Sequence, residues 1–108
     1  MAKQQKIEKP RAEWGSDVVV DLLKAFEIEY IAINPGATFR GLHDSLVNFE
    51  SGKGPQMIMC THEEIAVALA NGYARATGEI MATGLHNMVG LQHASMAIFN
   101  AWCDRTPI

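Results

Sequence analysis

The sequence has few cysteines and only a small excess of charge. Its 108 residues include two cysteines, Cys60 and Cys103, which lie far apart and form no CxxC pair. This scarcity excludes a disulfide framework and a cysteine-based zinc site, and it fits a reducing compartment such as the cytoplasm. The formal net charge is −3, so the chain lacks the basic excess that nucleic acid or an anionic membrane would attract. We therefore expect small molecules or other proteins as partners.

A long uninterrupted apolar run is also missing. The most apolar stretch, residues 80–102, is interrupted by glycine and polar residues, namely Gly84, His86, Asn87, Gln92 and His93. These interruptions argue against a membrane span. The first thirteen residues have no apolar core, so they do not resemble a signal peptide. We predict a flexible leader over residues 1–13 and one partial domain over residues 14–108.

Helical patterns occupy four stretches of the chain. Ser16 or Asp17 is expected to cap the first helix, the second is expected to start near Thr38, the third to run over 62–77, and the fourth to end before Pro107. The spacing of apolar residues predicts which side of three of these helices faces inward. These sides consist of Val18, Val19, Leu22, Leu23 and Phe26 in the first helix; Phe39, Leu42 and Leu46 in the second; and Leu91, Ser95, Ile98 and Trp102 in the fourth.

Three short strand patterns alternate with these helices: YIAINPG, QMIMC and IMATGLH. Pro35 and Gly36 suit the central positions of a type II turn after the first strand, and Gly78 suits the left-handed end of the third helix. The alternation predicts an α/β fold, with a parallel sheet flanked by helices on both faces. Because a further buried strand is expected after the fourth helix, we predict a domain truncated at that point.

Polar residues follow each predicted strand. They are Asn34 with Pro35 and Gly36, then His62 with Glu63, then His86 with Asn87. The carboxyl ends of parallel strands share one edge of the sheet, where open α/β sheets bind their ligands. The sequence therefore predicts one site at this edge.

The two carboxylates of the HEE segment have different interpretations. Thr61 and Glu64 have the spacing of a capping box, which gives Glu64 a structural role. Glu63 is expected in the first helical turn, where it either complements the helix dipole or serves a ligand. A metal site at His62 is not predicted, because the second histidine of HExxH is missing and these side chains are expected to point around the helix.

Three segments resemble a known family. They are NPGAT, HEEIAVALANGYARATG and GLHNMVGLQHASMAIFNAW, and the second is the most specific. They resemble the N-terminal pyrimidine-binding domain of thiamine diphosphate-dependent enzymes, the family of acetolactate synthase, benzoylformate decarboxylase and pyruvate decarboxylase. The resemblance runs from about residue 14 to residue 108. It implies a domain that binds thiamine diphosphate, acts on a 2-oxo acid and works in a homo-oligomer or other association.

The resemblance implies roles for five residues. Glu63 matches the glutamate that hydrogen-bonds a ring nitrogen of the cofactor's aminopyrimidine, promoting the imino tautomer that removes the thiazolium proton. His86, 23 residues later, matches a proton-transfer histidine of the benzoylformate decarboxylase branch; a structural histidine is the alternative. Asn34, Pro35 and Gly36 match the loop that lines the pyrimidine pocket.

The chain also departs from the family pattern. Ala37 stands where decarboxylases often have serine, and His93 stands where many members have asparagine. The 108 residues contain no GDG motif and no other glycine-rich phosphate cradle, so the diphosphate and magnesium are expected on a domain absent from this chain. Three interpretations stay open: an inactive fragment of a thiamine diphosphate-dependent lyase or synthase, a subunit of a split decarboxylase that pairs with a separate diphosphate-binding chain, and a non-catalytic interaction domain.

Overall fold

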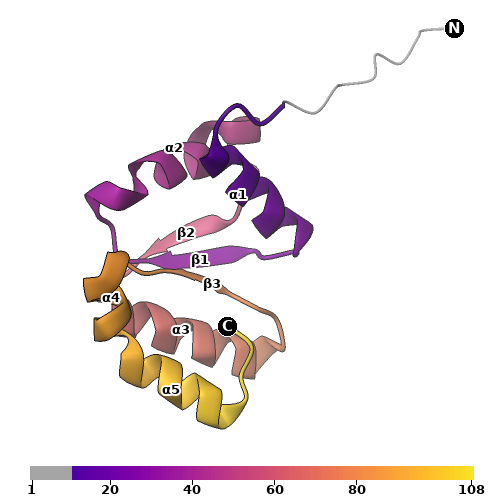
Figure 1. Cartoon of the computed structure of the whole chain (residues 1–108). Coiled ribbons are helices and arrows are strands. Elements are labelled where there is room, and N and C mark those ends of the chain that lie inside the picture. The colour runs from indigo at the N-terminus through magenta and orange to yellow at the C-terminus, as the bar shows by residue number, and fades with distance from the viewer. Residues whose placement is uncertain (1–10) are drawn as a thin grey trace, which may run out of the picture.

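A three-stranded parallel sheet forms the centre of the computed structural model, which describes residues 11–108 (Figure 1). Most of the predicted leader lies outside the described residues. The strands are ordered β2-β1-β3, and their bounds are β1 Tyr30–Ile33, β2 Gln56–Met59 and β3 Ala82–Gly84. Ile33 is opposite Met59 on one side and Gly84 on the other. All three strands therefore end level, and the segments that follow them start from one edge of the sheet.

Helices cover both faces of the sheet, which confirms the predicted α/β fold. In Figure 1, α1 and α2 lie on one face, α3 and α5 lie on the other, and α4 sits beside the carboxyl ends of the strands. The bounds are α1 Gly15–Ala25, η1 Ala37–Phe39, α2 Arg40–Asn48, η2 Phe49–Ser51, α3 Glu63–Thr77, α4 Asn87–His93 and α5 Ser95–Asp104. Among the described residues, no helix combines the length and apolar character needed to cross a membrane.

The first helix faces the sheet with a different side from the one predicted. Val20 is fully buried against Ile31 and Leu46, and Leu23 packs beside them. The other residues of the predicted face are 43–73% exposed, namely Val18, Val19, Leu22 and Phe26. Apolar residues lie on more than one side of α1, so their spacing alone does not indicate which side meets the sheet.

Asp17 ties the start of α1 to α2. The predicted role of Ser16 or Asp17 as N-cap is wrong, because Trp14 holds that position and Asp17 lies in the first turn. The buried carboxylate of Asp17 accepts hydrogen bonds from the backbone N–H groups of Glu13 and Trp14, both at 3.0 Å, and from Ser45 Oγ at 2.7 Å. The Ser45 bond is the main cause that lowers the pKa of Asp17; burial opposes it, and the backbone bonds support it.

Small side chains bring α3 and α5 together. Val67 of α3 packs with Ala94 and Ala97, all three almost fully buried. The predicted fourth helix is in fact two, α4 and α5, joined at Ala94. Its buried residues are Gly90, Ala94, Ala97 and Ala101. Of the predicted face, Ile98 packs against this cluster, whereas Leu91 and Trp102 are 53% and 80% exposed and Ser95 is also exposed. Close helix packing favours the small residues, so the large ones turn outward.

We expect Asp17→Asn to destabilise the fold at neutral pH. Because the folded pKa is lowered, the ionised carboxylate stabilises the fold above its ordinary pKa of about 3.9, and this stabilisation is lost as the pH falls through the folded value. Urea unfolding at several pH values measures the effect, with Asp21→Asn on the same helix as the control. This role would be contradicted if wild type and Asp17→Asn had the same free energy of unfolding at pH 7, or if the difference between them grew in acid.

We also expect the purified chain to associate with itself. Large apolar side chains are more than half exposed, among them Trp14, Phe26, Met59, Met88, Phe99 and Trp102. Within residues 11–108, no strand pairs with the outer edge of β2 or of β3. Light scattering coupled to gel filtration should show species larger than 11.8 kDa. A stable monomer that unfolds in one cooperative transition would contradict this expectation.

Candidate functional site

The segments after the three strands bring the predicted site residues to one edge of the sheet. Asn34 directly follows the central strand β1, Glu63 begins α3 after β2, and His86 precedes α4 after β3. The side chain of Asn34 lies near enough to Glu63 to lower the pKa of that carboxyl group, which relates the first two segments. The ring of His86 lies against Gly36, which joins the third segment to the first.

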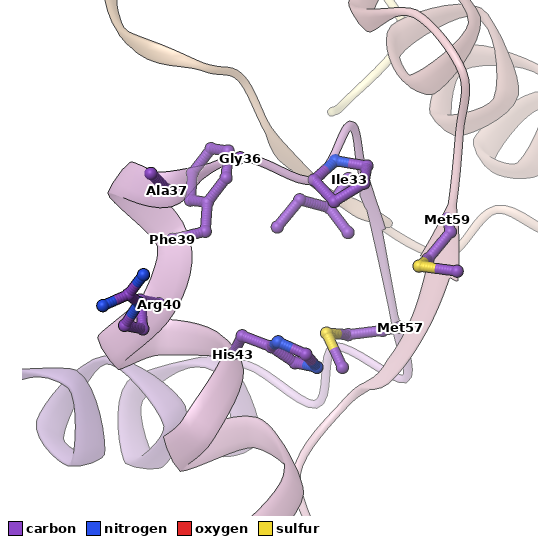
Figure 2. A pocket seen from close by; sticks show the side chains of 9 residues that line it. Ile33, Gly36, Ala37, Phe39, Arg40, His43, Met57 and Met59 are labelled. Carbon is purple, nitrogen blue, oxygen red and sulfur yellow. The ribbon is translucent and has the colours of Figure 1, made fainter.

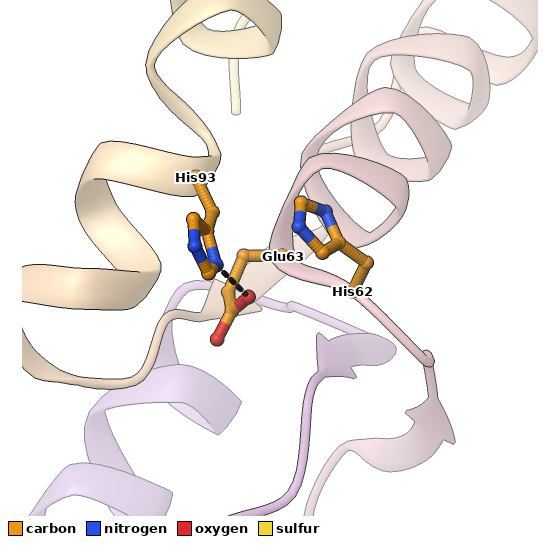
Figure 3. A group of neighbouring side chains, drawn as sticks. All are labelled: His62, Glu63 and His93. Carbon is orange, nitrogen blue, oxygen red and sulfur yellow. Dashed lines mark hydrogen bonds and ion pairs between the residues drawn. The ribbon is translucent and has the colours of Figure 1, made fainter.

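Glu63 is a buried carboxylate at the start of α3. Only 3% of the residue is exposed, and its Oε2 lies 3.3 Å from Nδ1 of His93 on α4 (Figure 3). The side chain of Asn34 is the largest cause that lowers the pKa of Glu63; burial opposes it. The backbone N–H of Glu63 and the imidazole of His93 lower the pKa further. In the free chain, Glu63 is therefore ionised at neutral pH.

Gly90 allows α4 to approach this carboxylate. A Cβ added at Gly90 would lie 2.8 Å from Oε1 and 2.9 Å from Cγ of Glu63. Any larger residue would push the helix and the carboxylate apart. Gly90 is itself buried at this contact.

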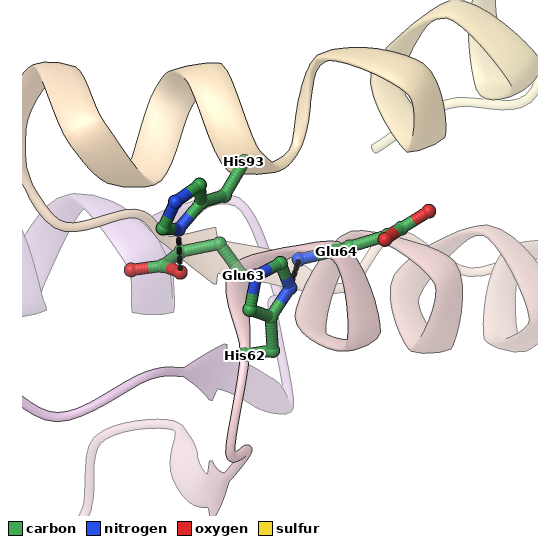
Figure 4. Close-up of polar contacts among 4 residues, drawn as sticks. All are labelled: His62, Glu63, Glu64 and His93. Atoms are coloured by element: carbon green, nitrogen blue, oxygen red, sulfur yellow. Dashed lines mark hydrogen bonds and ion pairs between the residues drawn. The ribbon is translucent and has the colours of Figure 1, made fainter.

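His62, and not Thr61, caps α3. The backbone N–H of Glu64 donates to Nδ1 of His62 at 3.2 Å, and the side chain of Glu64 is directed away along the helix (Figure 4). The predicted capping box between Thr61 and Glu64 is therefore wrong, because the helix begins one residue later than that motif requires. Since Nδ1 of His62 accepts a hydrogen bond, the neutral ring carries its proton on Nε2.

His62, Glu63 and His93 form a cluster that was not foreseen. Ligand-type atoms of the three residues lie within 4.8 Å of one another, so His62 and Glu63 come closer together than the sequence suggested. These are residue types of zinc sites. However, the two imidazole rings are stacked with centroids 4.8 Å apart and planes at 21°, so their lone pairs point along nearly parallel planes. In His62, Nδ1 accepts the capping hydrogen bond and Nε2 carries the proton, so neither nitrogen has a lone pair free for a metal ion. The arrangement therefore suits ring stacking better than metal binding.

His86 packs beneath the segment after β1. Its ring meets Phe39 edge to face, with centroids 6.1 Å apart, and a Cβ added at Gly36 would lie 2.2 Å from its Cδ2. Gly36 has φ −169° and ψ 164°, so the predicted type II turn is wrong. The backbone there is extended, and glycine is needed for the close approach of the His86 ring and not for a left-handed conformation.

A cavity of about 190 Å³ borders the same segment (Figure 2). Most of its wall is apolar, and Arg40 and His43 of α2 supply its charged and polar groups. The lining residues are Ile33, Pro35, Gly36, Ala37, Phe39, Arg40, His43, Met57 and Met59. The edge of the sheet thus offers a buried carboxylate on the α3 side and an apolar cavity with a cationic side chain on the α2 side.

Sequence reasoning did not assign Phe39, Gly90 or His93 to the site. Gly90 and His93 are three residues apart on a helix that begins at a strand end, so they share one side of that helix. This shared side could have indicated from the sequence that His93 faces the site, although His93 lies thirty positions after Glu63. The packing of Phe39 on His86 depends on tertiary structure alone.

Comparisons with known proteins agree with this architecture. The family model described as "Thiamine pyrophosphate enzyme, N-terminal TPP binding domain" matches residues 13–108. The chain is 34% identical over 106 residues to the acetolactate synthase large subunit of Lactococcus lactis subsp. lactis, covering 98% of this chain and 18% of that protein. It is 30% identical over 94 residues to the corresponding subunit of Haemophilus influenzae, covering 87% and 16%.

A solved structure agrees as well. A protein from Mycobacterium smegmatis, described as thiamin diphosphate-dependent, superposes with a TM-score of 0.70 at 28% identity, covering 85% of this chain and 17% of that one. The chain thus spans less than a fifth of the length of these relatives. The family model covers nearly all of the described residues. The chain therefore belongs to the thiamine pyrophosphate enzyme family, as an N-terminal TPP-binding domain of the acetolactate synthase-like type.

Proposed function

We propose that the chain binds the aminopyrimidine ring of thiamine diphosphate at the carboxyl edge of its sheet, with Glu63 hydrogen-bonded to a ring nitrogen. The observation that carries the proposal is the carboxylate of Glu63, which is buried but reaches the edge where the three strands end. A buried carboxyl group can share a proton with a weakly basic ring nitrogen, because little water competes for that hydrogen bond. Family membership supports this ligand.

The residues around Glu63 fit such a ligand. Asn34 and His93 fix the carboxylate, and Gly90 keeps α4 close to it. Because the pKa of Glu63 is lowered in the free chain, the group must gain a proton before it can donate to a ring nitrogen. When bound, thiamine diphosphate supplies the carbanion chemistry, and the protein groups orient it.

The substrate we propose is a 2-oxo acid. Arg40 at the cavity can pair with its carboxylate, and the apolar wall with Ile33 and Met57 suits an apolar side chain. The ring of His86 contacts Phe39 and Gly36, two residues that line this cavity, which supports a proton-transfer role near the substrate carbonyl. The two sequence relatives reported above are acetolactate synthase large subunits, so the decarboxylase reaction that His86 favours stays a prediction.

The remainder of the site is proposed to come from elsewhere. The sequence contains no GDG motif, so we propose that a diphosphate-binding domain holds the magnesium and the diphosphate, in a homo-oligomer or other association. The chain alone would then supply half a site and be inactive. The two cysteines are unpaired, which supports a cytoplasmic location.

Two alternatives make different predictions. A subunit of a split decarboxylase would bind the cofactor firmly only with a separate diphosphate-binding chain. A non-catalytic interaction domain would not depend on Glu63 at all. The burial of Glu63 favours a ligand-binding role. Burying an ionised carboxylate costs free energy, and buried ionisable groups with a shifted pKa are concentrated at functional sites.

We expect Glu63→Gln to weaken the binding of thiamine diphosphate. Glutamine cannot transfer a proton to the ring nitrogen, and loss of a hydrogen bond that involves a charged group reduces affinity by about tenfold to hundredfold. Calorimetric titration with thiamine diphosphate and magnesium measures the change. The matched control is Glu64→Gln, whose side chain is exposed one residue later. Equal affinities of wild type and Glu63→Gln would support the non-catalytic alternative.

We expect Gly90→Ala to destabilise the fold by about 1–3 kcal/mol and to weaken cofactor binding, because the added methyl group meets the Glu63 carboxylate. Gly72→Ala on α3 is the control, since a Cβ there meets nothing within 4 Å. That change should be neutral or stabilise by up to about 1 kcal/mol, since alanine favours a helix interior. Urea unfolding compares the two variants, and equal effects would show that the contact between Gly90 and Glu63 is unimportant.

A further inference from the structure

His93 connects a buried acid with solvent. The side chain of Glu63 is 4% exposed, whereas the imidazole bonded to it is 48% exposed. The two are joined through Oε2 of Glu63 and Nδ1 of His93, 3.3 Å apart. An imidazole has two nitrogens on opposite sides of its ring, so one can face the acid while the other exchanges protons with water.

The ring of His93 is held in a defined orientation. It stacks on the ring of His62, which is itself fixed by the hydrogen bond from the backbone N–H of Glu64 to Nδ1 of His62. Gly90, one turn earlier on α4, keeps the helix against Glu63. Among residues 11–108, the titratable groups in contact with His93 are Glu63, at the start of α3, and His62, which precedes it.

We propose that His93 carries protons between Glu63 and solvent, and so positions the proton that Glu63 shares with a bound aminopyrimidine. This inference rests on the proposed function. In the inward step, a proton from water binds Nε2 of His93 while the proton on Nδ1 passes to Oε2 of Glu63. The ring ends neutral with its proton on Nε2, and the carboxylate becomes a carboxylic acid. The reverse step returns the proton to water, so no net charge accumulates on the ring.

The need for such a carrier follows from the burial of Glu63. The group is ionised in the free chain and must be protonated to donate to a ring nitrogen. A ligand seated at the edge of the sheet would cover the remaining approach to this carboxylate. His93 reaches it from α4, on the side away from β1, as Figure 3 shows. Its ring can therefore deliver the proton while the ligand stays in place.

The test separates the rate of proton uptake from the affinity. The chain is mixed rapidly with thiamine diphosphate and magnesium in weak buffer, and a pH indicator follows the protons taken up. His93→Asn keeps a hydrogen-bonding side chain but cannot carry a proton through a ring. We expect uptake to be about 100-fold slower in this variant, the usual scale for loss of one proton-transfer group, while Kd changes only a few-fold.

Two further variants complete the test. In His93→Ala, added imidazole should restore the rate, since it can occupy the space of the missing ring. Gln92→Ala, an exposed neighbour on the same helix, should behave as wild type. Uptake by His93→Asn as fast as by wild type would overturn the proton carrier and leave the proposed function intact. Equal uptake by Glu63→Gln and by wild type would overturn the proposed function and this inference with it.

Discussion

The site depends on a carboxylate held where water is scarce. Glu63 is buried at the first position of α3, and an ionised group at such a place requires hydrogen-bond partners. His93 provides one because Gly90 lets α4 approach, and Asn34, directly after β1, lowers the pKa of the carboxyl group from the other side. The level strand ends, the start of α3 and the close packing of α4 are thus parts of one arrangement around Glu63.

The two layers of helices serve this arrangement differently. On one face, α3, α4 and α5 meet through small residues such as Ala94, Ala97 and Gly90, which brings the helices close and fixes the acid. On the other face, η1 and α2 leave a cavity beside Gly36, lined by methionine and aromatic side chains. The segment from Asn34 to Gly36 runs between them, in contact with Glu63 through its first residue and with His86 through its last.

Much of the fold could be predicted from the sequence, because the alternation of strands and helices depends on local patterns. All three strands and the left-handed end of α3 at Gly78 were predicted in place. The inward faces of α1 and α5 were predicted only in part: Leu23 and Ile98 pack inward, whereas Phe26 and Trp102 lie on the outside, because only packing decides which side is buried. The cap of α3 was misplaced by one residue, a shift that no local rule resolves.

The candidate site was predicted in part for the same physical reason. Asn34, Glu63 and His86 follow strands of a parallel sheet, so topology alone brings them to one edge. His93 contacts Glu63 across thirty positions of sequence, and this contact depends on the angle at which α4 leaves β3. That angle is set by the packing of Gly90 and Ala94, which becomes visible only in three dimensions.

A structure of the chain crystallised with thiamine diphosphate would test the central claim most directly. We expect an oxygen of Glu63 within about 2.6–3.2 Å of a pyrimidine nitrogen, with the contact to His93 retained. A pyrimidine ring bound elsewhere, such as in the cavity beside Met57, with Glu63 still in contact only with Asn34 and His93, would contradict the claim that this buried carboxylate is the group that recognises the cofactor.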